Sequence, residues 1–414
     1  MPPAQSPATL TLPNHAQREP PPMPTQHDIA IIGAGPAGLS LALSLAQQGR
    51  SVALVERLPA ATLAAPPYDG REIALTQGSA SLLRTLGAWD KLSEADIAPL
   101  GEAVVLNGPS TRALRFHAAG TQLGHLVPNH RIRQTLFEAA AAQPNIHLIA
   151  NTAATDIATT ADTATLTLSD TCQIAARLIV AADTRFSEMR RRVGIPARML
   201  DFGKTMLVCR MAHALPHNAI ATEWFGIGQT IAILPLHGNQ SSLVITLPAD
   251  QAARLAALPE PDFNAEITQR YAARLGDMHL VGTRHLYPLV AVYASRFVGQ
   301  RLALVGDAAV GMHPVTAHGF NFGLSGQHLL ADALGDDPGA PGPLARYQAA
   351  HRRATLPLYL ATNAIARLYT DDRPPARALR SALIGAGARL APLRHAIAAR
   401  LLAAPQRGLL TRPA

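Results

Sequence analysis

The chemistry-bearing residues nearest the start of the chain are glycines and one glutamate, at spacings that suit a nucleotide. The segment GAGPAG consists of Gly33, Ala34, Gly35, Pro36, Ala37 and Gly38. Glycine at its first position allows a tight turn, at its third position lets the backbone approach a pyrophosphate, and at its last position lets a helix pack closely on a strand. Glu56 follows 18 residues after Gly38, close to the spacing of about 20 at which an acid binds the adenosine ribose. This combination predicts a dinucleotide-binding site.

The elements that must position these residues are strand, turn, helix and strand. Residues 28–32 have the length and β-branched content of a buried parallel strand, and apolar residues then recur at helix spacing until Gly49. Residues 51–55 form a second apolar run, which ends at Glu56. A glutamate at a strand end is by itself also typical of a solvated carboxylate, but the surrounding elements favour a ribose contact.

The same region has a rival interpretation as a membrane span. Residues 29–49 carry no charge, and their length is close to the ~20 residues that a spanning helix needs. Pro36 among the glycines, and the paired Gln47 and Gln48, argue against a spanning helix.

The composition indicates a globular protein of at least two domains. The chain has 414 residues, of which 48% are hydrophobic and 15% charged. Its two cysteines indicate neither a disulfide framework nor a metal site. The net charge of +8 invites a nucleic-acid interpretation, but with only 4% aromatic residues no nucleic-acid partner is expected. Residues 1–26 contain eight prolines and no signal-like apolar run, so a disordered leader is expected.

Two further candidates are arginines. Arg71 could reach the dinucleotide as a fixed cation, or it could be a surface residue paired with Glu72. Residues 129–142 are expected to form a helix that carries Arg131 and Arg133, which from the sequence alone make a basic helix face.

Two acidic residues follow later apolar runs. Residues 177–182 end at Asp183 and have the form of another parallel strand. Residues 301–305 end at Gly306 and Asp307. A carboxylate at the carboxyl edge of an open α/β sheet faces the ligand crevice, although Asp307 could also cap the following segment.

The remaining patterns predict a second sheet and several helices. Alternating stretches favour strands of an antiparallel sheet over residues 102–106, 113–117, 205–211, 220–225, 230–234 and 242–247. Strands over 146–149 and 164–168 return to the nucleotide fold, and residues 57–70 are expected to be a loop over the cofactor. Helices are expected over residues 79–86, 266–275 and 321–334.

The chain from Leu344 onward is expected to be helical. After Asp372 it has eight arginines and no carboxylate. An apolar stripe at helix spacing is formed by Leu390, Leu393, Ile397 and Leu401. Such a helix could lie on an anionic membrane, with the arginine stems beside the stripe, or could pack on the core.

Together these segments resemble the class A flavoprotein monooxygenases, the para-hydroxybenzoate hydroxylase superfamily, and within it the ubiquinone-biosynthesis hydroxylases. The resemblance covers residues 27 to about 370. It rests on GAGPAG with Glu56, on Arg71, on Arg133-Gln-Thr-Leu136, on Asp183, and on Gly306-Asp307 with His313-Pro314 and Gly319-Phe-Asn321.

The resemblance implies an α/β fold: a Rossmann-like FAD-binding domain of the GR2 type, an antiparallel-sheet substrate domain and C-terminal helices. It implies cofactor contacts by Gly33, Gly35, Pro36, Ala37, Gly38, Glu56, Arg57, Arg71, Arg133, Asp183, Gly306, Asp307, Pro314, Gly319, Phe320 and Asn321. The expected parts are a leader (1–26), an FAD-binding domain (27–99, 128–198 and 297–343), a substrate domain (100–127 and 199–296) and a helical region (344–414).

The activity that the resemblance implies is hydroxylation of an aromatic ring. NADH or NADPH would bind transiently and reduce FAD, O₂ would form a flavin C4a-hydroperoxide, and one oxygen atom would pass to an electron-rich phenol. The chain has no second GxGxxG, which agrees with a transient nicotinamide nucleotide. A polyprenylated ubiquinone precursor is the expected substrate. The expected location is the cytoplasm, with peripheral contact to the inner membrane or to a biosynthetic complex as a further expectation.

The chain also departs from the family pattern. Relatives usually have Asp-Gly where this chain has Asp183-Thr184, Gly-Gln-Gly where it has Ala317-His318-Gly319, and aspartate at Gly326. His318 and Pro314 are the catalytic candidates of this loop, because a histidine beside a flavin could titrate near neutral pH or contact the phenol. A histidine there is also often a structural donor. The loop resembles a divergent branch of ubiquinone hydroxylases, which leaves the ring position open.

Other activities remain as alternatives. A monooxygenase of another aromatic pathway, a prenyl reductase that consumes no O₂, and a non-catalytic scaffold stabilised by FAD would share the nucleotide domain. A flavin-dependent halogenase would need a Trp-x-Trp-x-Ile-Pro segment, whereas Trp89 and Trp224 are the only tryptophans and lie far apart in sequence.

Overall fold

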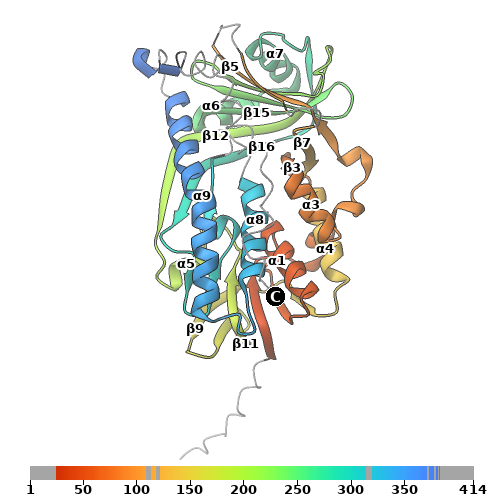
Figure 1. Cartoon of the computed structure of the whole chain (residues 1–414). Coiled ribbons are helices and arrows are strands. Elements are labelled where there is room, and N and C mark those ends of the chain that lie inside the picture. Colours follow the sequence, from red (N-terminus) through yellow and green to blue (C-terminus); the bar gives the residue numbers. More distant parts are fainter. Residues whose placement is uncertain are drawn as a thin grey trace, which may run out of the picture.

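The strands lie in two large sheets and a small one. The computed structural model describes residues 25–108, 113–117, 122–313, 319–370, 373–376, 379, 380 and 382. Within these residues, two sheets have eight strands each and a third has three. Figure 1 shows the large sheets in separate layers, one around β11 in the lower half of the view and the other around β12, β15 and β16 above it. Pro314, His318, the apolar stripe 390–401 and most of the expected leader lie outside the described residues.

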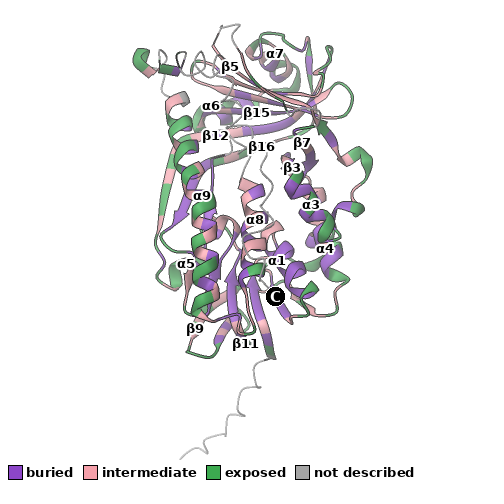
Figure 2. Ribbon diagram, viewed as in Figure 1, coloured by how far each residue is buried: buried purple, intermediate pink, exposed green. Residues whose placement is uncertain are grey.

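The first large sheet has a parallel centre. Its strands in spatial order are β17 (Val298–Gly299), β18 (Leu302–Leu304), β11 (Gln173–Ala181), β1 (Thr25–Ile32), β2 (Val52–Val55) and β8 (Ile146–Ile149). The neighbours from β18 to β8 are parallel, whereas β17 pairs antiparallel with β18. β10 (Ala164–Leu168) and β9 (Ala154–Thr159) add an antiparallel pair beside β11. The central strands are buried, as expected for a parallel sheet covered on both faces (Figure 2).

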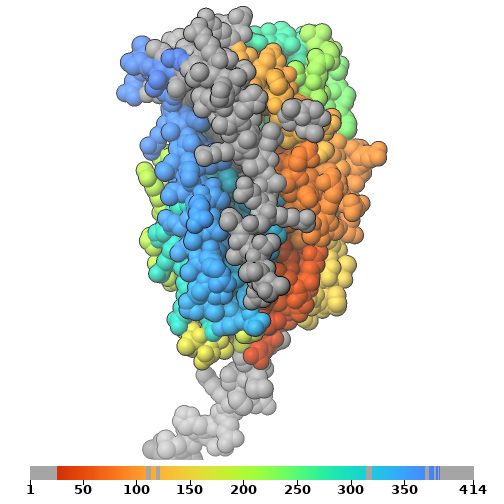
Figure 3. Space-filling view, in the orientation of Figure 1, coloured from red at the N-terminus to blue at the C-terminus, as the bar shows by residue number. Residues whose placement is uncertain are grey.

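Helices surround this sheet. They are α1 (Pro36–Gln47), α2 (Ala60–Ala64), α3 (Gln77–Thr85), α4 (Asn129–Ala141), α5 (Glu188–Arg192), α8 (Gly319–Ala333) and α9 (Pro341–Thr370), with short 3-10 turns at Trp89–Lys91, Glu94–Asp96 and Gly306–Ala308. α1 packs against α8 and α4, and α8 packs against α9. In the space-filling view, α9 (blue) and the N-terminal segment (red and orange) lie on opposite sides of one face (Figure 3).

The second large sheet carries helices on one face. Its strands in spatial order are β19 (Val310–Gly311), β16 (Met278–Ala294), β12 (Ala197–His213), β15 (Gln240–Pro248), β14 (Thr230–Pro235), β13 (Ile220–Phe225), β5 (Glu102–Asn107) and β6 (Ala113–His117). α6 (Ala249–Ala257) and α7 (Glu260–Arg270) cover the face that carries Leu207, Ile233 and Ile245. The opposite face is turned toward the first sheet (Figure 1). The small sheet, β3 (Glu72–Thr76), β7 (Gly124–Pro128) and β4 (Ala98–Leu100), lies between the two parts.

The α/β fold class and most predicted elements are confirmed, with three corrections. The predicted loop 57–70 contains the short helix α2. The helix predicted over 266–275 spans Glu260–Arg270 instead, because Ala272 and Ala273 have φ values of 53° and 50° and end it earlier. The predicted antiparallel sheet includes one parallel pair, β13 with β5.

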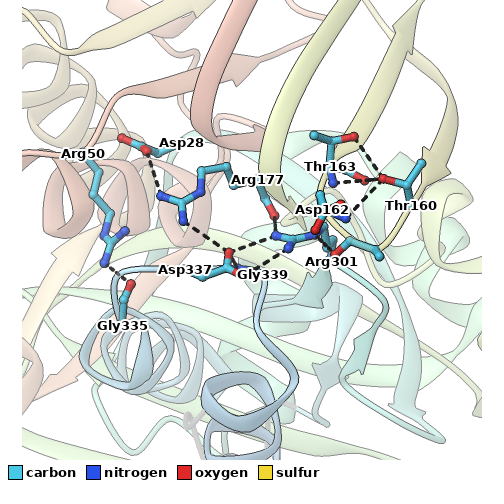
Figure 4. A network of polar contacts seen from close by, with 11 residues as sticks. Asp28, Arg50, Thr160, Asp162, Thr163, Arg177, Arg301, Gly335, Asp337 and Gly339 are labelled. Atoms are coloured by element: carbon cyan, nitrogen blue, oxygen red, sulfur yellow. Dashed lines mark hydrogen bonds and ion pairs between the residues drawn. The ribbon is translucent and has the colours of Figure 1, made fainter.

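A polar network ties the amino ends of the parallel strands to the turn between α8 and α9 (Figure 4). Arg301, 7% exposed, donates to both carboxylate oxygens of Asp337 at 2.9 and 3.0 Å and to the Arg177 carbonyl oxygen at 2.9 Å. Arg177 lies between Asp28 and Asp337, at 3.8 and 3.6 Å. Because this network lies at the amino ends of the strands, it leaves their carboxyl ends available for a ligand.

Candidate active site

The predicted nucleotide residues come together at the carboxyl ends of adjacent parallel strands. Gly33 follows β1, Glu56 follows β2, Asp183 follows β11, and Gly306 with Asp307 follows β18. Because these strands are parallel neighbours, the residues after them meet at one edge of the sheet.

The glycine loop has the geometry that the motif requires. Gly33 has φ +104°, and a Cβ atom there would lie 2.7 Å from the Ala182 carbonyl oxygen. A Cβ on Gly38 would lie 1.9 Å from the Gly33 oxygen, so α1 could not pack as closely on β1. A Cβ on Gly35 would meet nothing within 4 Å. Gly35 is the N-cap of α1, and no described side chain caps the helix, so its first N–H groups remain available for phosphate oxygens.

Glu56 is held in place by backbone amides. Its Oε2 accepts a hydrogen bond from the Ala34 amide at 2.7 Å, and its Oε1 accepts one from the Leu58 amide at 3.0 Å. Each carboxylate oxygen can accept a second hydrogen bond, so the group can still receive ribose hydroxyls. Arg57 is exposed beside it.

Asp183 and Asp307 differ in their surroundings. Burial raises the pKa of Asp183, and its Oδ1 has no hydrogen-bond partner among the described residues. Asp307 is more exposed, and its Oδ2 accepts a hydrogen bond from Arg185 at 3.1 Å. A Cβ on Gly306 would lie 2.8 Å from the Ala37 side chain, so β18 ends in close contact with the start of α1.

Arg71 pairs with Asp69, so its predicted alternative pairing with Glu72 is wrong. The guanidinium lies 2.6 Å from Asp69 Oδ2 and 5.2 Å from the centre of the Tyr287 ring. Tyr287 in turn donates to the Asp69 carbonyl oxygen at 2.6 Å. Burial raises the pKa of Tyr287, and the charges of Arg71 and Arg133 partly offset this rise. The charges of Arg71 and Arg133 therefore both act on the Tyr287 hydroxyl group. Arg131, in contrast, donates a hydrogen bond to Asp96 at 3.2 Å.

The start of α8 has a positioning role that the sequence did not predict. The Asn321 carboxamide accepts from the Thr76 amide at 3.1 Å and donates to the Ala74 carbonyl oxygen at 2.9 Å, so it joins α8 to β3. Phe320 packs against the main core, and a Cβ on Gly319 would meet nothing within 4 Å.

Sequence reasoning also missed a buried ion pair between the two parts. Arg210 on β12 donates two hydrogen bonds to Glu72 Oε1, at 2.6 and 2.8 Å. Burial raises the pKa of Glu72 to about 7 despite this cation. The Arg210 guanidinium also lies 5.2 Å from the centre of the Tyr68 ring. These residues are about 140 positions apart, so local spacing gave no signal for the pair.

FAD fits this edge of the first sheet. Gly35 leaves room for a pyrophosphate, α1 presents its amide groups, and Glu56 can bind a ribose. Asp183 Oδ1 is a buried acceptor without a partner in the described part of the chain. Across residues described by the structure, no cluster of three or more His, Cys, Asp or Glu side chains could hold a metal ion.

Comparison with known proteins defines the class. The profile of the FAD binding domain family matches residues 26–353. The chain is 43% identical to the ubiquinone hydroxylase UbiM of Neisseria meningitidis, over 92% of this chain and 85% of that protein. It is 38% identical to the ubiquinone hydroxylase UbiL of Rhodospirillum rubrum, over 89% and 87%. The crystal structure of p-nitrophenol 4-monooxygenase PnpA from Pseudomonas putida matches in fold with a TM-score of 0.74 and 17% identity, covering 92% of this chain and 99% of that one.

The matched profile shows that the chain belongs to the FAD binding domain class, and its fold is that of the FAD-dependent monooxygenase PnpA. Within that class, the chain belongs to the family that contains the ubiquinone hydroxylases.

Proposed function

We propose that the protein hydroxylates the aromatic ring of a polyprenylated ubiquinone precursor, with O₂ as the oxygen source and NADH or NADPH as the electron donor. The observation that carries this proposal is the glycine loop with Glu56, whose geometry fits FAD in a chain so similar to two ubiquinone hydroxylases. FAD, when bound, supplies the activation of O₂ and the transfer of one oxygen atom.

The residues of this chain bind and orient the reactants. The N-terminus of α1 and Gly35 hold the pyrophosphate, and Glu56 holds the adenosine ribose. Arg71, fixed by Asp69 and Tyr287, supplies positive charge beside the cofactor. The uncovered face of the second sheet closes the site from above and excludes water from the reacting ring. The predicted domain boundaries remain part of this proposal, with the first sheet assigned to FAD and the second to the substrate.

The test is product analysis in cells that lack their own ubiquinone ring hydroxylases. Expression of this chain is expected to restore the quinone or to shift the accumulated precursors to ring-hydroxylated products, and the masses and positions name the carbons. The matched control is Gly35→Val, which should leave the precursors unchanged. If the wild-type chain leaves them unchanged while the purified protein binds FAD and consumes NAD(P)H and O₂, its substrate belongs to another aromatic pathway.

We also propose a peripheral membrane contact through the arginine-rich C-terminal segment. None of the helices in the described part of the chain is long and apolar enough to cross a membrane. The eight arginines after Asp372, without a carboxylate, favour an anionic surface. Cosedimentation with vesicles of anionic phospholipid should be lost when residues 384–414 are removed. Equal binding by the truncated chain would contradict the contact.

A further inference from the structure

The uncovered face of the second sheet carries one acidic side chain in an apolar row. Strand pairing places Glu223 on β13 opposite Val105 on β5 and Ala232 on β14. From Ala232 the row continues through Val244 on β15 and Val208 on β12 to His285 on β16. Residues paired across neighbouring strands share a face, so these side chains project from the same side of the sheet.

This side is the one turned toward the nucleotide site. The residues that alternate with the row, Leu207, Ile233 and Ile245, pack against α6 and α7 on the other side. Arg210 lies two positions after Val208, on the same side, and binds Glu72 of β3. Tyr287 lies two positions after His285 and donates to the Asp69 carbonyl oxygen. The His285 end of the row therefore lies beside the segment that holds Arg71, and Glu223 lies four strands farther along the same face.

The described side chains leave part of this row accessible. Val105, Glu223, Ala232 and Val244 are all partly exposed, whereas Ile231, Ile233 and Ile245 on the helix-covered side are at most 2% exposed. From Glu223 to Val244 the accessible part of the row spans two strand spacings, or about 10 Å, and Val208 beyond it is buried. That length can accommodate an aromatic ring with the start of an apolar tail.

Glu223 has no electrostatic or hydrogen-bond partner in the part of the chain that the structure describes. Burial is the one cause that raises the pKa of its carboxyl, to about 8. Strand pairing places Lys204, Arg210, His279, His285 and Tyr287 on the same face as Glu223. Arg210 binds Glu72, and His285 and Tyr287 lie near the Tyr68–Arg71 segment. Glu223 is only partly buried, so water can reach its carboxyl group, and a ligand that lies along the apolar row can replace that water with a hydrogen bond of its own.

We propose that the Glu223 carboxyl hydrogen-bonds a ring hydroxyl of the substrate and makes the site select uncharged phenols over benzoates. This inference rests on the proposed function and names the group on the second sheet that orients the ring. A neutral carboxyl can donate to or accept from a phenol. A carboxylate on the ring next to that hydroxyl would meet a second acidic group in an apolar wall, whose ionised form repels it.

The test is ligand binding to the FAD-loaded protein, followed by the change in flavin fluorescence. The probes are 2-allylphenol and 3-allyl-2-hydroxybenzoate, which differ by one carboxylate beside the hydroxyl. Wild-type protein should bind the phenol more tightly than the benzoate at pH 7, and at least tenfold more tightly at pH 9. Its affinity for the benzoate should fall further as the pH rises from 7 to 9, because Glu223 ionises over that range.

Two variants separate the charge of Glu223 from its hydrogen bond. At pH 9, where the Glu223 carboxyl is mostly ionised in wild type, Glu223→Gln should bind the benzoate at least fivefold more tightly than wild type does. It should bind the phenol within about threefold of wild type and lose the pH dependence. Glu223→Leu should bind the phenol about tenfold more weakly, since it loses one hydrogen bond. The matched control is Glu102→Gln on neighbouring β5, because Glu102 binds Arg115 at 2.8 Å. It should behave as wild type.

The inference is overturned if Glu223→Gln and Glu223→Leu, with full FAD content, bind both probes as wild type does, or if wild-type protein shows no preference. Its failure is distinct from failure of the proposed function. Ring-hydroxylated quinones in cells that express Glu223→Leu at wild-type levels would reject the role of Glu223 alone. Unchanged precursors with wild-type protein, together with the expected probe selectivity, would reject only the ubiquinone substrate.

Discussion

A side chain at Gly35 should prevent FAD binding, whereas a side chain at Gly38 should prevent folding. Gly35→Val should abolish FAD retention while the apoprotein still folds, because its Cβ meets no atom within 4 Å and projects where a pyrophosphate must approach. Gly38→Val should instead prevent folding, since its Cβ would lie 1.9 Å from the Gly33 carbonyl oxygen. Flavin absorbance of the purified protein and thermal unfolding of the apoprotein measure the two effects. Yellow holoprotein from Gly35→Val would contradict the binding mode.

Gly326 stands where the family pattern leads us to expect an aspartate, and its contact with the His351 ring explains the difference. A Cβ on Gly326 would lie 2.6 Å from His351 Cε1, so the aspartate that the family resemblance leads us to expect there would collide with this ring. His351 is 1% exposed and lies against Phe297 and Tyr347, with ring centroids at 5.3 and 5.6 Å. The two positions therefore have to change together.

His351 should also make the protein sensitive to acid. Burial lowers its pKa to about 4. The unfolded chain binds the proton below pH 6.5 and the folded chain does not, so stability is lost as the pH falls from 6.5 toward 4. Between pH 6.5 and 5 the loss is about 2 kcal/mol. His351→Gln should reduce the difference between the unfolding midpoints at pH 7 and pH 5, and an unchanged difference would contradict the assignment. Part of the acid sensitivity should remain, because burial also lowers the pKa of His313 to about 4.

At the scale of elements, the sequence predicted those strands and helices in which apolar residues recur at regular spacing along the whole element. β8 and β6 have the predicted bounds, α8 lies within two residues of its predicted range, and α1 ends before Gly49 as expected. β16 was missed because Gly282, Arg284 and Pro288 interrupt its alternation, and its pairing with β12 shifts register twice. The nucleotide motif was predictable because its chemistry lies within a few residues. The contacts of Arg71 were not, because Tyr287 reaches it from a distant strand.

The polar network at the amino ends of the strands should hold the turn between α8 and α9. Asp337→Ala would remove both acceptors of the buried Arg301 guanidinium. Because Asp337 is 37% exposed, the expected loss is about 1–3 kcal/mol rather than the larger loss of a fully buried pair. Asp336→Ala is the matched control, since Asp336 is the exposed neighbour. Urea unfolding measures the difference, and equal midpoints for the two variants would show that the network adds nothing.

At the scale of the whole molecule, the Arg210–Glu72 pair joins the second large sheet to the FAD-binding part. Glu72 has a fully buried side chain, and its pKa is raised to about 7 even with Arg210 beside it. An acid whose pKa is raised in the folded state binds more protons there than in the unfolded state. Its contribution to stability is therefore lost as the pH rises from about 4.5 through 7. Without the cation this loss should become larger and extend to higher pH.

Arg210→Met keeps the length of the side chain and removes the charge that Glu72 faces. It should lower the midpoint of thermal unfolding more at pH 8 than at pH 6, because the ionised Glu72 is then buried without a cation. Adding Glu72→Gln to Arg210→Met should remove this difference between the two pH values. A single variant with equal losses at pH 6 and pH 8, or a double variant as pH-dependent as the single one, would contradict the coupling. With the expected result, the contact between the second large sheet and the FAD-binding part is stabilised by a charge pair whose balance changes near neutral pH.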